Sequence, residues 1–475
     1  MKFYNYSRWT KIENIMNSLE TPCIVLLSDN WNDFGYQTYY LSHFIKEDKT
    51  IIELGGVKIL DRDSKCTSIK DKFTELENQY CSLGVSMDYY EKLGTLGKSI
   101  YEPILLGLKD AAYDEKIKES FINLEGFQDS LLREVSSRNA LNNAKAMLEK
   151  LKLENSYNFS YKTQIEGADE PHEVKFNFGN RNPLPSRVTA IVGKNGTGKT
   201  AVLSDLAFDL SEEYKVAQEK FSPKKPELGK LITISYSVFG GFEKKKQNKE
   251  DDITYQNFGV LDEKNTYNKD QMLKNLEKSI DRILEFERTE IWIEILSEFN
   301  NKEFVNFIHQ QIVMKHDFSL LGKLSSGQRM IFEIITNIVG NIRNNSLIIF
   351  DEPEIHLHPN AIGLLMKALY FVLEKYESFA IIATHVPQVI QQIPAKSVIV
   401  FEREDNIPII RELPIESFGE DLTSITNEIF ETMNVFDNYK IVLKKLYESM
   451  TYDEIIALFK NKLPLNAKIY LKSLE

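Results

Sequence analysis

Residues 193–200 read Gly-Lys-Asn-Gly-Thr-Gly-Lys-Thr and directly follow a largely apolar run, Val-Thr-Ala-Ile-Val, at residues 188–192. They fit the pattern G-x-x-x-x-G-K-[ST], in which glycines let the backbone curl so that successive N–H groups surround a phosphate. A helix that starts near Lys199 would add its positive end to the same anion. Eight matched positions after a strand favour this interpretation over a chance glycine-rich turn.

This phosphate loop (residues 193–200) predicts a site for ATP and Mg²⁺. Lys199 would reach the β- and γ-phosphates, and the Thr200 hydroxyl would ligate the metal. The residues predicted to bind the nucleotide here are Gly193, Asn195, Gly196, Gly198, Lys199 and Thr200.

The length and composition indicate a folded protein of several domains. The chain has 475 residues, of which 42% are hydrophobic and 27% charged, so two or three domains are expected. Neither a membrane-spanning run nor a secretion signal is recognisable, which predicts a cytoplasmic protein. Three cysteines without a C-x-x-C spacing predict reduced thiols. The net charge of −12 argues against a chain that coats nucleic acid over its whole surface, although a local basic groove stays open.

We expect three segments along the chain. Residues 1–150 predict an N-terminal α+β accessory domain for partner docking, with a small β-meander at residues 22–60 and helices after Ile69. Residues 151–412 carry the phosphate loop, preceded by two strands at 159–163 and 173–178, and followed by a helical insertion at about 262–320. Residues 413–475 predict helices, one of them opened by a capping box at Thr451 and Glu454. Phe176 or Phe178 could stack on adenine, but their alternation with Val174 favours core packing.

Two further strands each deliver polar residues at their carboxyl end. Residues 347–350 are apolar and lead into Asp351 and Glu352, where Asp351 would hold Mg²⁺ through water and Glu352 would polarise the attacking water. Residues 381–384 lead into His385, which would contact the γ-phosphate. Each feature alone is common at the end of a strand, and their order after the phosphate loop favours a catalytic role for Glu352 and His385.

A short segment before the acidic strand, Leu-Ser-Ser-Gly-Gln at residues 324–328, precedes an apolar helical run. By itself Ser-Ser-Gly is an ordinary helix cap. With the phosphate loop, the acidic strand and the histidine strand, it makes residues 157–412 resemble the ATP-binding cassette (ABC) superfamily, in its soluble SMC- and RecF-like, AAA_21-like branch. That resemblance implies an α/β fold with a mixed sheet and a helical lid, flanked here by the N-terminal α+β extension and the C-terminal helices.

The resemblance also implies a split site in a homodimer or higher homo-oligomer. In such ATPases the segment at 324–328, called the signature segment below, contacts ATP held by the opposite subunit. The residues assigned to this contact are Ser325, Ser326, Gly327 and Gln328.

The run Asp-Glu-Pro-Glu-Ile-His-Leu-His-Pro at residues 351–359 resembles that of OLD-type, Septu-type and retron-associated ATPases of bacterial antiphage defence. Membrane-transporter cassettes usually have aspartate where His358 stands, so an energy-coupling subunit of a transporter is disfavoured. His356 and His358 could form a metal pair, but their spacing and the resemblance favour a loop contact between subunits.

The sequence differs in two ways from the families that it resembles. The glutamine expected after the strand ending near Ile234 is missing, so Ser237 or water could take its place, while Gln247 and Gln256 are expected in a loop. OLD proteins add a TOPRIM nuclease that needs a D-x-D motif. No such motif follows Glu402, which we interpret as a solvated strand end.

The chain is therefore expected to be an ATP hydrolase that controls a separate effector, such as an HNH nuclease, in antiphage defence. A DNA-repair or chromosome-maintenance ATPase is the alternative. For retron-associated members a reverse transcriptase and its DNA product (msDNA) are implied as partners. Contact with DNA, msDNA or RNA could involve lysines of one loop and its neighbours, although acidic residues there favour a solvated loop: Lys224, Lys225, Lys230, Lys244, Lys245, Lys246 and Lys249.

Overall fold

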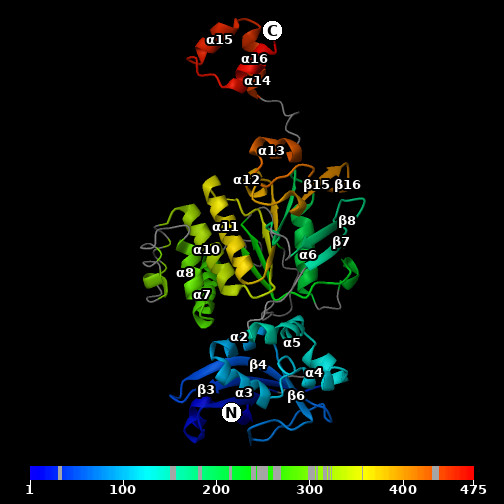
Figure 1. Cartoon of the computed structure of the whole chain (residues 1–475), viewed down its shortest axis with the longest axis vertical. Helices are drawn as coiled ribbons and strands as arrows, with labels where there is room; N and C mark the ends of the chain where they lie inside the picture. Colours follow the sequence, from blue (N-terminus) through cyan, green and yellow to red (C-terminus); the bar gives the residue numbers. More distant parts are fainter. Residues whose placement is uncertain are drawn as a thin grey trace. The chain divides into compact units, whose positions relative to one another are not determined.

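The computed structural model describes residues 1–29, 35–149, 157–179, 184–212, 217–236, 242, 255–259, 269–297, 305, 309–313, 318, 321, 324–355, 357–430 and 438–474. The chain divides into two compact units, residues 1–419 and 420–475. Figure 1 shows both units, with colours that follow the chain from blue at the N-terminus to red at the C-terminus. No helix among these residues is long and apolar enough to cross a membrane.

The N-terminal part of the first unit is built on a six-stranded sheet with the order β5-β1-β2-β3-β4-β6. Strands β1 and β2 are parallel, and the other neighbours are antiparallel. The strands are β1 (Lys2–Ser7), β2 (Cys23–Ser28), β3 (Tyr39–Ile45), β4 (Ile51–Asp61), β5 (Lys72–Phe73) and β6 (Tyr80–Gly84). The helices are α1 (Ile12–Ile15), α2 (Met87–Thr95), α3 (Lys98–Gly107), α4 (Glu115–Phe121) and α5 (Val135–Leu148).

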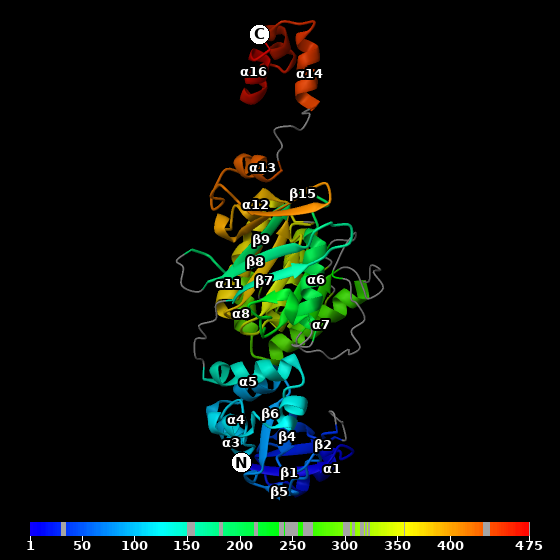
Figure 2. The same cartoon turned by 90° about the vertical axis from the view of Figure 1, so that its right-hand side faces the viewer.

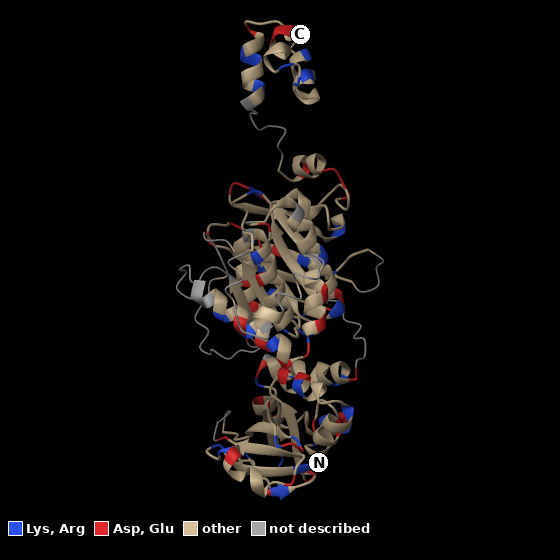
Figure 3. Cartoon of the chain, turned by 90° about the vertical axis from the view of Figure 1, so that its left-hand side faces the viewer, with Lys and Arg blue, Asp and Glu red and all other residues tan. Residues whose placement is uncertain are grey.

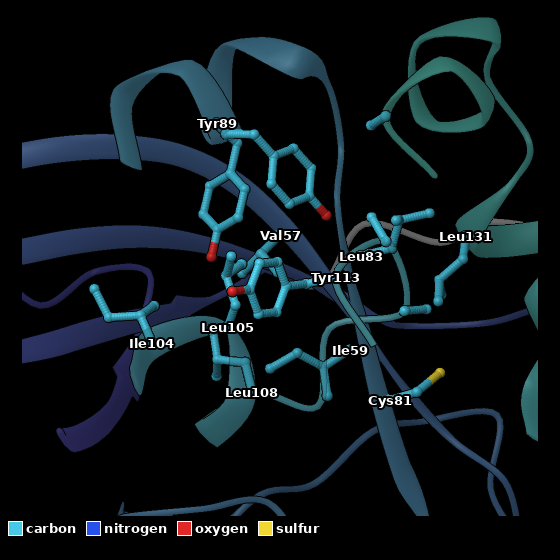
Figure 4. Close-up of a cluster of buried hydrophobic side chains, with 14 of the residues drawn as sticks. Val57, Ile59, Cys81, Leu83, Tyr89, Ile104, Leu105, Leu108, Tyr113 and Leu131 are labelled. Carbon is cyan, nitrogen blue, oxygen red and sulfur yellow. The ribbon is translucent and has the colours of Figure 1, made fainter. Parts of the chain in front are cut away.

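The core of this region lies between the sheet and the helices. Figure 4 shows side chains from β4, β6, α2 and α3 converging on it, among them Ile59, Leu83, Tyr89 and Leu105, and all four are buried. Of the three cysteine thiols, those of Cys23 and Cys81 are buried, that of Cys66 is exposed, and all are free.

The predicted meander is confirmed by β2, β3 and β4, which are consecutive antiparallel neighbours. The prediction did not include β1, which pairs in parallel with β2, and it was wrong for β5 and β6, which occupy sequence that was expected to be helical. Strand β6 misled the prediction because all five of its residues are buried. A strand covered on both faces lacks the alternation that identifies a half-buried strand.

A seven-stranded mixed sheet forms the second part of this unit, in the order β12-β11-β13-β14-β9-β15-β16. All neighbours are parallel except the last pair, β15 and β16. The strands are β9 (Val188–Gly193), β11 (Leu231–Ser235), β12 (Tyr255–Gly259), β13 (Leu347–Asp351), β14 (Phe379–Thr384), β15 (Val398–Glu404) and β16 (Ile407–Glu412). Every residue of β9, β11, β13 and β14 is buried, as expected for parallel strands covered on both faces.

Helices cover both faces of this sheet, which confirms the predicted α/β class. In Figure 1, α6 (Lys199–Ser211) lies on one side, and α10 (Ser326–Asn341) and α11 (Pro359–Lys375) lie on the other. The short helix α12 (Pro387–Ile390) follows β14. A three-stranded antiparallel sheet, ordered β10-β7-β8, lies beside α6 in Figure 2. Its strands are β7 (Tyr157–Thr163), β8 (His172–Phe178) and β10 (Phe221–Ser222).

The described residues of the expected insertion are helical. They form α7 (Lys269–Glu285), α8 (Thr289–Ser297) and a π-helical turn at His309–Val313. Helices α7 and α10 cross closely at Gly340, where a Cβ atom would lie 2.4 Å from the Ser279 carbonyl oxygen. The helix that starts at the signature segment is thereby packed tightly against the insertion.

Charged side chains connect the N-terminal region to the part of this unit that is built on the seven-stranded sheet. Asp88 of α2 pairs with Arg343, which follows α10, and with Arg282 of α7. Glu91 of α2 pairs with Arg288 at 3.1 Å. Elsewhere on the unit, Figure 3 shows positions of basic and acidic residues interspersed along the ribbon.

The described residues of the second unit, 420–430 and 438–474, form four helices: α13 (Leu422–Phe430), α14 (Asn438–Tyr447), α15 (Tyr452–Leu458) and α16 (Leu465–Lys472). A small core joins the last three and includes Leu443, Ile455 and Leu471. The predicted capping box is present, because Thr451 accepts from the backbone N–H of Glu454 and the Glu454 side chain accepts from that of Thr451.

Candidate functional site

The candidate site lies where parallel strands β9, β13 and β14 end. Residue Asp351 is level with Ala383, and Thr384 is level with Val192. Because the carboxyl ends of parallel strands meet at one edge of a sheet, the phosphate loop, the Asp-Glu pair and His385 are brought together. These segments are the ones that the sequence predicted to share a site.

The phosphate loop needs glycine for two different reasons. A Cβ atom at Gly193 would lie 2.1 Å from the Phe401 carbonyl oxygen, so there is no room for a side chain. Gly198 has φ of +91°, in the left-handed region that other residues rarely adopt. Asn195 and Gly196 lie between them and are exposed.

The Lys199 side chain lies inside the loop. Its Nζ donates to the carbonyl oxygens of Gly193 at 2.9 Å and Lys194 at 3.0 Å. Burial lowers the pKa of Lys199, while the carboxylates of Glu352 and Asp351 oppose that change. The ammonium group is therefore held between the loop and the acidic end of β13, where a phosphate chain would need positive charge.

Thr200 and Asp351 form the candidate metal site. The Thr200 hydroxyl lies 3.1 Å and 3.2 Å from the two carboxylate oxygens of Asp351. Burial and the neighbouring Glu352 carboxylate raise the pKa of Asp351 to about 6. A hydroxyl and a carboxylate are hard oxygen donors, and Mg²⁺ in nucleotide sites typically binds one or two such groups together with phosphate oxygens. The residues therefore fit Mg²⁺.

Glu352 and His385 face each other across the ends of β13 and β14. Glu352 has φ of +51°, rare for a residue with a side chain, and its N–H donates to the Ala383 carbonyl oxygen at 2.9 Å. Its Oε1 lies 3.4 Å from Nδ1 of His385. This contact lowers the pKa of Glu352 and raises that of His385. Glu352 is thus favoured as a carboxylate, the form that can accept a proton from water.

The signature segment is formed as a helix cap. Ser325 accepts from the N–H of Gln328 at 3.3 Å, and the Gln328 side chain accepts from the N–H of Ser325 at 3.1 Å. Ser326 is the first residue of α10, and a side chain at Gly327 would meet open space. Ser325 and Gln328 are exposed. Within the described part of the chain, Ser325 hydrogen-bonds Gln328 and not the phosphate loop.

Several secondary predictions are corrected. Gln256 lies in β12, level with Ile232, and not in a loop. Glu402 pairs with Arg411 at 2.7 Å and is not simply solvated. Lys225 and Lys230 are buried, with 1% of each exposed, and cannot reach a phosphate backbone.

The aromatic pair behaves as the alternation predicted, since Phe176 and Phe178 are buried in the core. His358 is exposed just before α11. Predictions for Ser237, Gln247, His356 and the lysines at 244–246 and 249 fall outside the described residues.

Three residues near the site were missed by the sequence reasoning. His172 of β8 is buried, and its Nε2 would lie 3.1 Å from a Cβ at Gly198. Arg403 of β15 donates to the Gly167 carbonyl oxygen at 2.9 Å, which holds the β7–β8 turn beside β15. Glu354 accepts from the Thr384 hydroxyl at 2.7 Å. Only Glu354 had a visible signal, as a second acid directly after Pro353 in the Asp-Glu-Pro-Glu run.

A family match covers part of this site. Residues 219–391, which include Asp351, Glu352 and His385, match the family described as "AAA domain, putative AbiEii toxin, Type IV TA system". The chain contains an ABC-type P-loop ATPase domain. A domain of this type binds ATP.

Three proteins that are similar to this chain share 25% or less of their sequence with it. Protein ea59 of Escherichia phage lambda is 25% identical over 497 aligned residues, covering 94% of this chain and 94% of ea59. An SmcHead solved with the C-winged helix domain of ScpA is 13% identical with a TM-score of 0.31, covering 54% of this chain and 97% of its own. A nucleotide-free ATP-binding cassette from an ABC transporter is 14% identical with a TM-score of 0.33, covering 60% of this chain and 99% of its own.

Proposed function

We propose that this protein hydrolyses ATP in paired, head-to-tail subunits, and that the ATP cycle controls a separate effector in antiphage defence. The observation that carries the proposal is the arrangement at one sheet edge, where Lys199, the Thr200–Asp351 pair and the Glu352–His385 pair meet. These groups are a phosphate-binding cation, a metal-binding oxygen pair and a carboxylate suited to activate water.

The roles follow from the positions of the side chains. Lys199 binds the β- and γ-phosphates, and the N–H groups of the phosphate loop surround the same anion. Thr200 and Asp351 would hold Mg²⁺, which would neutralise charge on the phosphate oxygens. Glu352 orients the attacking water and accepts its proton, while His385 contacts the γ-phosphate.

The second half of each site comes from another subunit in this proposal. The signature segment begins α10, a helix of 16 residues, with exposed polar groups at its positive end. Domains of this type usually dimerise, and Ser325, Ser326, Gly327 and Gln328 would then contact the γ-phosphate on the partner. Lys199 and Ser325 of one chain thus serve different nucleotides.

The link to defence rests on the resemblance of the run at 351–359 to that of defence ATPases. Since no D-x-D motif follows Glu402, the damaging activity is assigned to a partner such as an HNH nuclease, with DNA, msDNA or RNA as a further ligand. The site of action in this proposal is the cytoplasm.

Glu352→Gln tests the hydrolytic part of the proposal. The amide keeps the shape of the side chain but cannot accept a proton, so ATP turnover should fall about 100-fold or more. ATP should remain bound, and light scattering should show a larger ATP-dependent species than the wild type forms. Glu412→Gln, on an exposed position of β16, is the matched control. Unchanged turnover in Glu352→Gln would reject this assignment of the base.

A further inference from the structure

Glu354 is a buried carboxyl group beside the candidate catalytic pair. It lies three residues after Asp351, and only 5% of its side chain is exposed. The intervening Pro353 is also buried, and the N–H of Ile355 donates to the Glu352 carbonyl oxygen at 3.2 Å. This tight turn directs Glu352 and Glu354 toward the end of the same neighbouring strand, β14.

Glu354 contacts both the side chain and the backbone at the end of β14. Its Oε1 accepts from the Thr384 hydroxyl at 2.7 Å and from the His385 N–H at 3.2 Å. The Thr384 hydroxyl in turn accepts from the N–H of Val386 at 3.0 Å. One carboxylate oxygen thereby fixes the last residue of the strand and the residue that follows it.

The fixed segment determines where the His385 imidazole lies. Nδ1 of His385 is 3.4 Å from Oε1 of Glu352 and 3.9 Å from Oε1 of Glu354. The imidazole side chain is 42% exposed, so packing alone leaves it room to turn. Its orientation therefore depends on the backbone that Glu354 holds.

A buried carboxyl group is costly in this position. Burial raises the pKa of Glu354, although the hydrogen bond from Thr384 opposes that shift. Its Oε2 is buried and has no hydrogen-bond partner among the described residues. A side chain kept here at such a cost is better explained by the contacts of Oε1 than by a contribution to folding stability.

We propose that Glu354 is a positioning residue for ATP hydrolysis, which holds His385 against Glu352 through the Thr384 hydroxyl and the His385 amide. This inference rests on the proposed function. Glu354 does not touch the nucleotide in this scheme, so its loss impairs the chemical step and spares ATP binding. Displacing a catalytic group by about 1 Å can cost on the order of 100-fold in rate.

The experiment compares four variants of the full chain by steady-state hydrolysis and by the affinity for a fluorescent ATP analogue. Glu354→Ala should lower kcat by about 10- to 100-fold, with the dissociation constant within about threefold of the wild type. Glu354→Gln keeps an oxygen acceptor at Oε1 and should restore kcat to within about threefold. Thr384→Val removes one of the two donors to Glu354, so its kcat should lie between those of the two Glu354 variants. Thr384→Ser keeps the hydroxyl and should have the kcat of the wild type.

Three outcomes would overturn the inference. They are full kcat in Glu354→Ala, a Gln variant as slow as the Ala variant, and a loss of ATP affinity that accounts for the lost rate. Thermal unfolding shows whether a variant has a folding defect. If Glu354→Ala or Thr384→Val is defective, the kcat values of Glu354→Gln and Thr384→Ser test the inference instead. Wild type and Glu352→Gln are measured alongside, because wild type without ATP turnover, or Glu352→Gln with full turnover, indicates failure of the proposed function instead.

Discussion

The Thr200 hydroxyl lies 3.1 Å from a carboxylate oxygen of Asp351, although 151 positions separate the two residues in the chain. The contact joins the first turn of α6 to the end of β13. Asp351 ends β13, and Thr200 follows β9 through the phosphate loop. Both strands are buried along their whole length, so the fold itself places the two side chains of the candidate metal site. Rigid elements of this kind hold functional groups more accurately than loops do.

Gly198→Ala should disrupt nucleotide binding without unfolding the protein. A methyl group there would lie 3.1 Å from both His172 Nε2 and Ile165 Cδ1, and the backbone is left-handed at φ +91°. We expect ATP affinity to fall at least about 10-fold, since strain of about 1–2 kcal/mol is relieved by moving the loop. Gly363→Ala is the control, because a Cβ there meets open space within α11. Equal ATP affinities in the two variants, measured by fluorescence titration, would contradict the role given to Gly198.

The grouping of the candidate catalytic residues could be predicted because each of them stands at or just after the carboxyl end of a buried strand. Asp351 and Glu352 come after the apolar run at 347–350, His385 comes one residue after the apolar run at 381–383, and the carboxyl ends of parallel strands meet at a common edge. The positions of these residues in the sequence were therefore enough to predict that they lie close together, without knowledge of the packing.

The parts that sequence could not predict depend on contacts between distant segments. Glu354 is recognisable as a positioning residue only once Thr384 is known to lie beside it. The pairing of Asp88 with Arg343 spans 255 positions, and no local pattern indicates it. The prediction of helix in the region of β6 was wrong for a related reason, because burial on both faces removes the alternation of apolar and polar residues by which a strand is recognised.

Mixing two inactive variants should restore hydrolysis if the sites are split between subunits. Lys199→Ala removes the phosphate cation, and Ser325→Arg places a bulky charge at the exposed cap of α10. A mixed dimer retains one site with an intact Lys199 and an intact Ser325. With random pairing, roughly half of the dimers are mixed and each keeps one of two sites, so about a quarter of wild-type turnover is expected.

The complementation has a direct control. Lys199→Ala mixed with Lys199→Ala,Ser325→Arg cannot assemble an intact site and should stay inactive. Turnover that remains at background after both single variants are refolded together would argue that each chain completes its own site.

The buried pair of Asp88 and Arg343 should contribute strongly to stability. Burial alone would raise the pKa of Asp88, but the guanidinium groups of Arg343 and Arg282 hold it far below its usual range. Asp88→Ala leaves Arg343, whose side chain is 1% exposed, without this carboxylate, and a loss of about 3–5 kcal/mol is expected. Glu77→Ala breaks the exposed Lys70–Glu77 pair and should cost less than about 1 kcal/mol. Urea unfolding distinguishes the two, and similar losses would show that the junction is not held by this pair.

Asp110 should make the stability of the N-terminal region depend on pH. Burial raises the pKa of Asp110 to about 7, despite hydrogen bonds from the Tyr90 hydroxyl at 2.7 Å and from the Ala112 and Tyr113 N–H groups. Between its unfolded pKa, near 4, and about 7, the folded state binds a proton that the unfolded state has lost. The wild type should therefore lose stability as pH rises through this range, by at most about 1.4 kcal/mol per unit.

Asp110→Asn removes this titration while keeping an acceptor for the two backbone N–H groups. The stability of the variant relative to the wild type should rise by about 3 kcal/mol between pH 5 and pH 8, because over most of that range folded wild type keeps a proton that the unfolded chain has already lost. Denaturation at both pH values, followed by tyrosine fluorescence, measures that change. A stability difference between variant and wild type that is the same at pH 5 and pH 8 would mean that Asp110 is already ionised in the folded protein at pH 5, held in that form by its three hydrogen bonds.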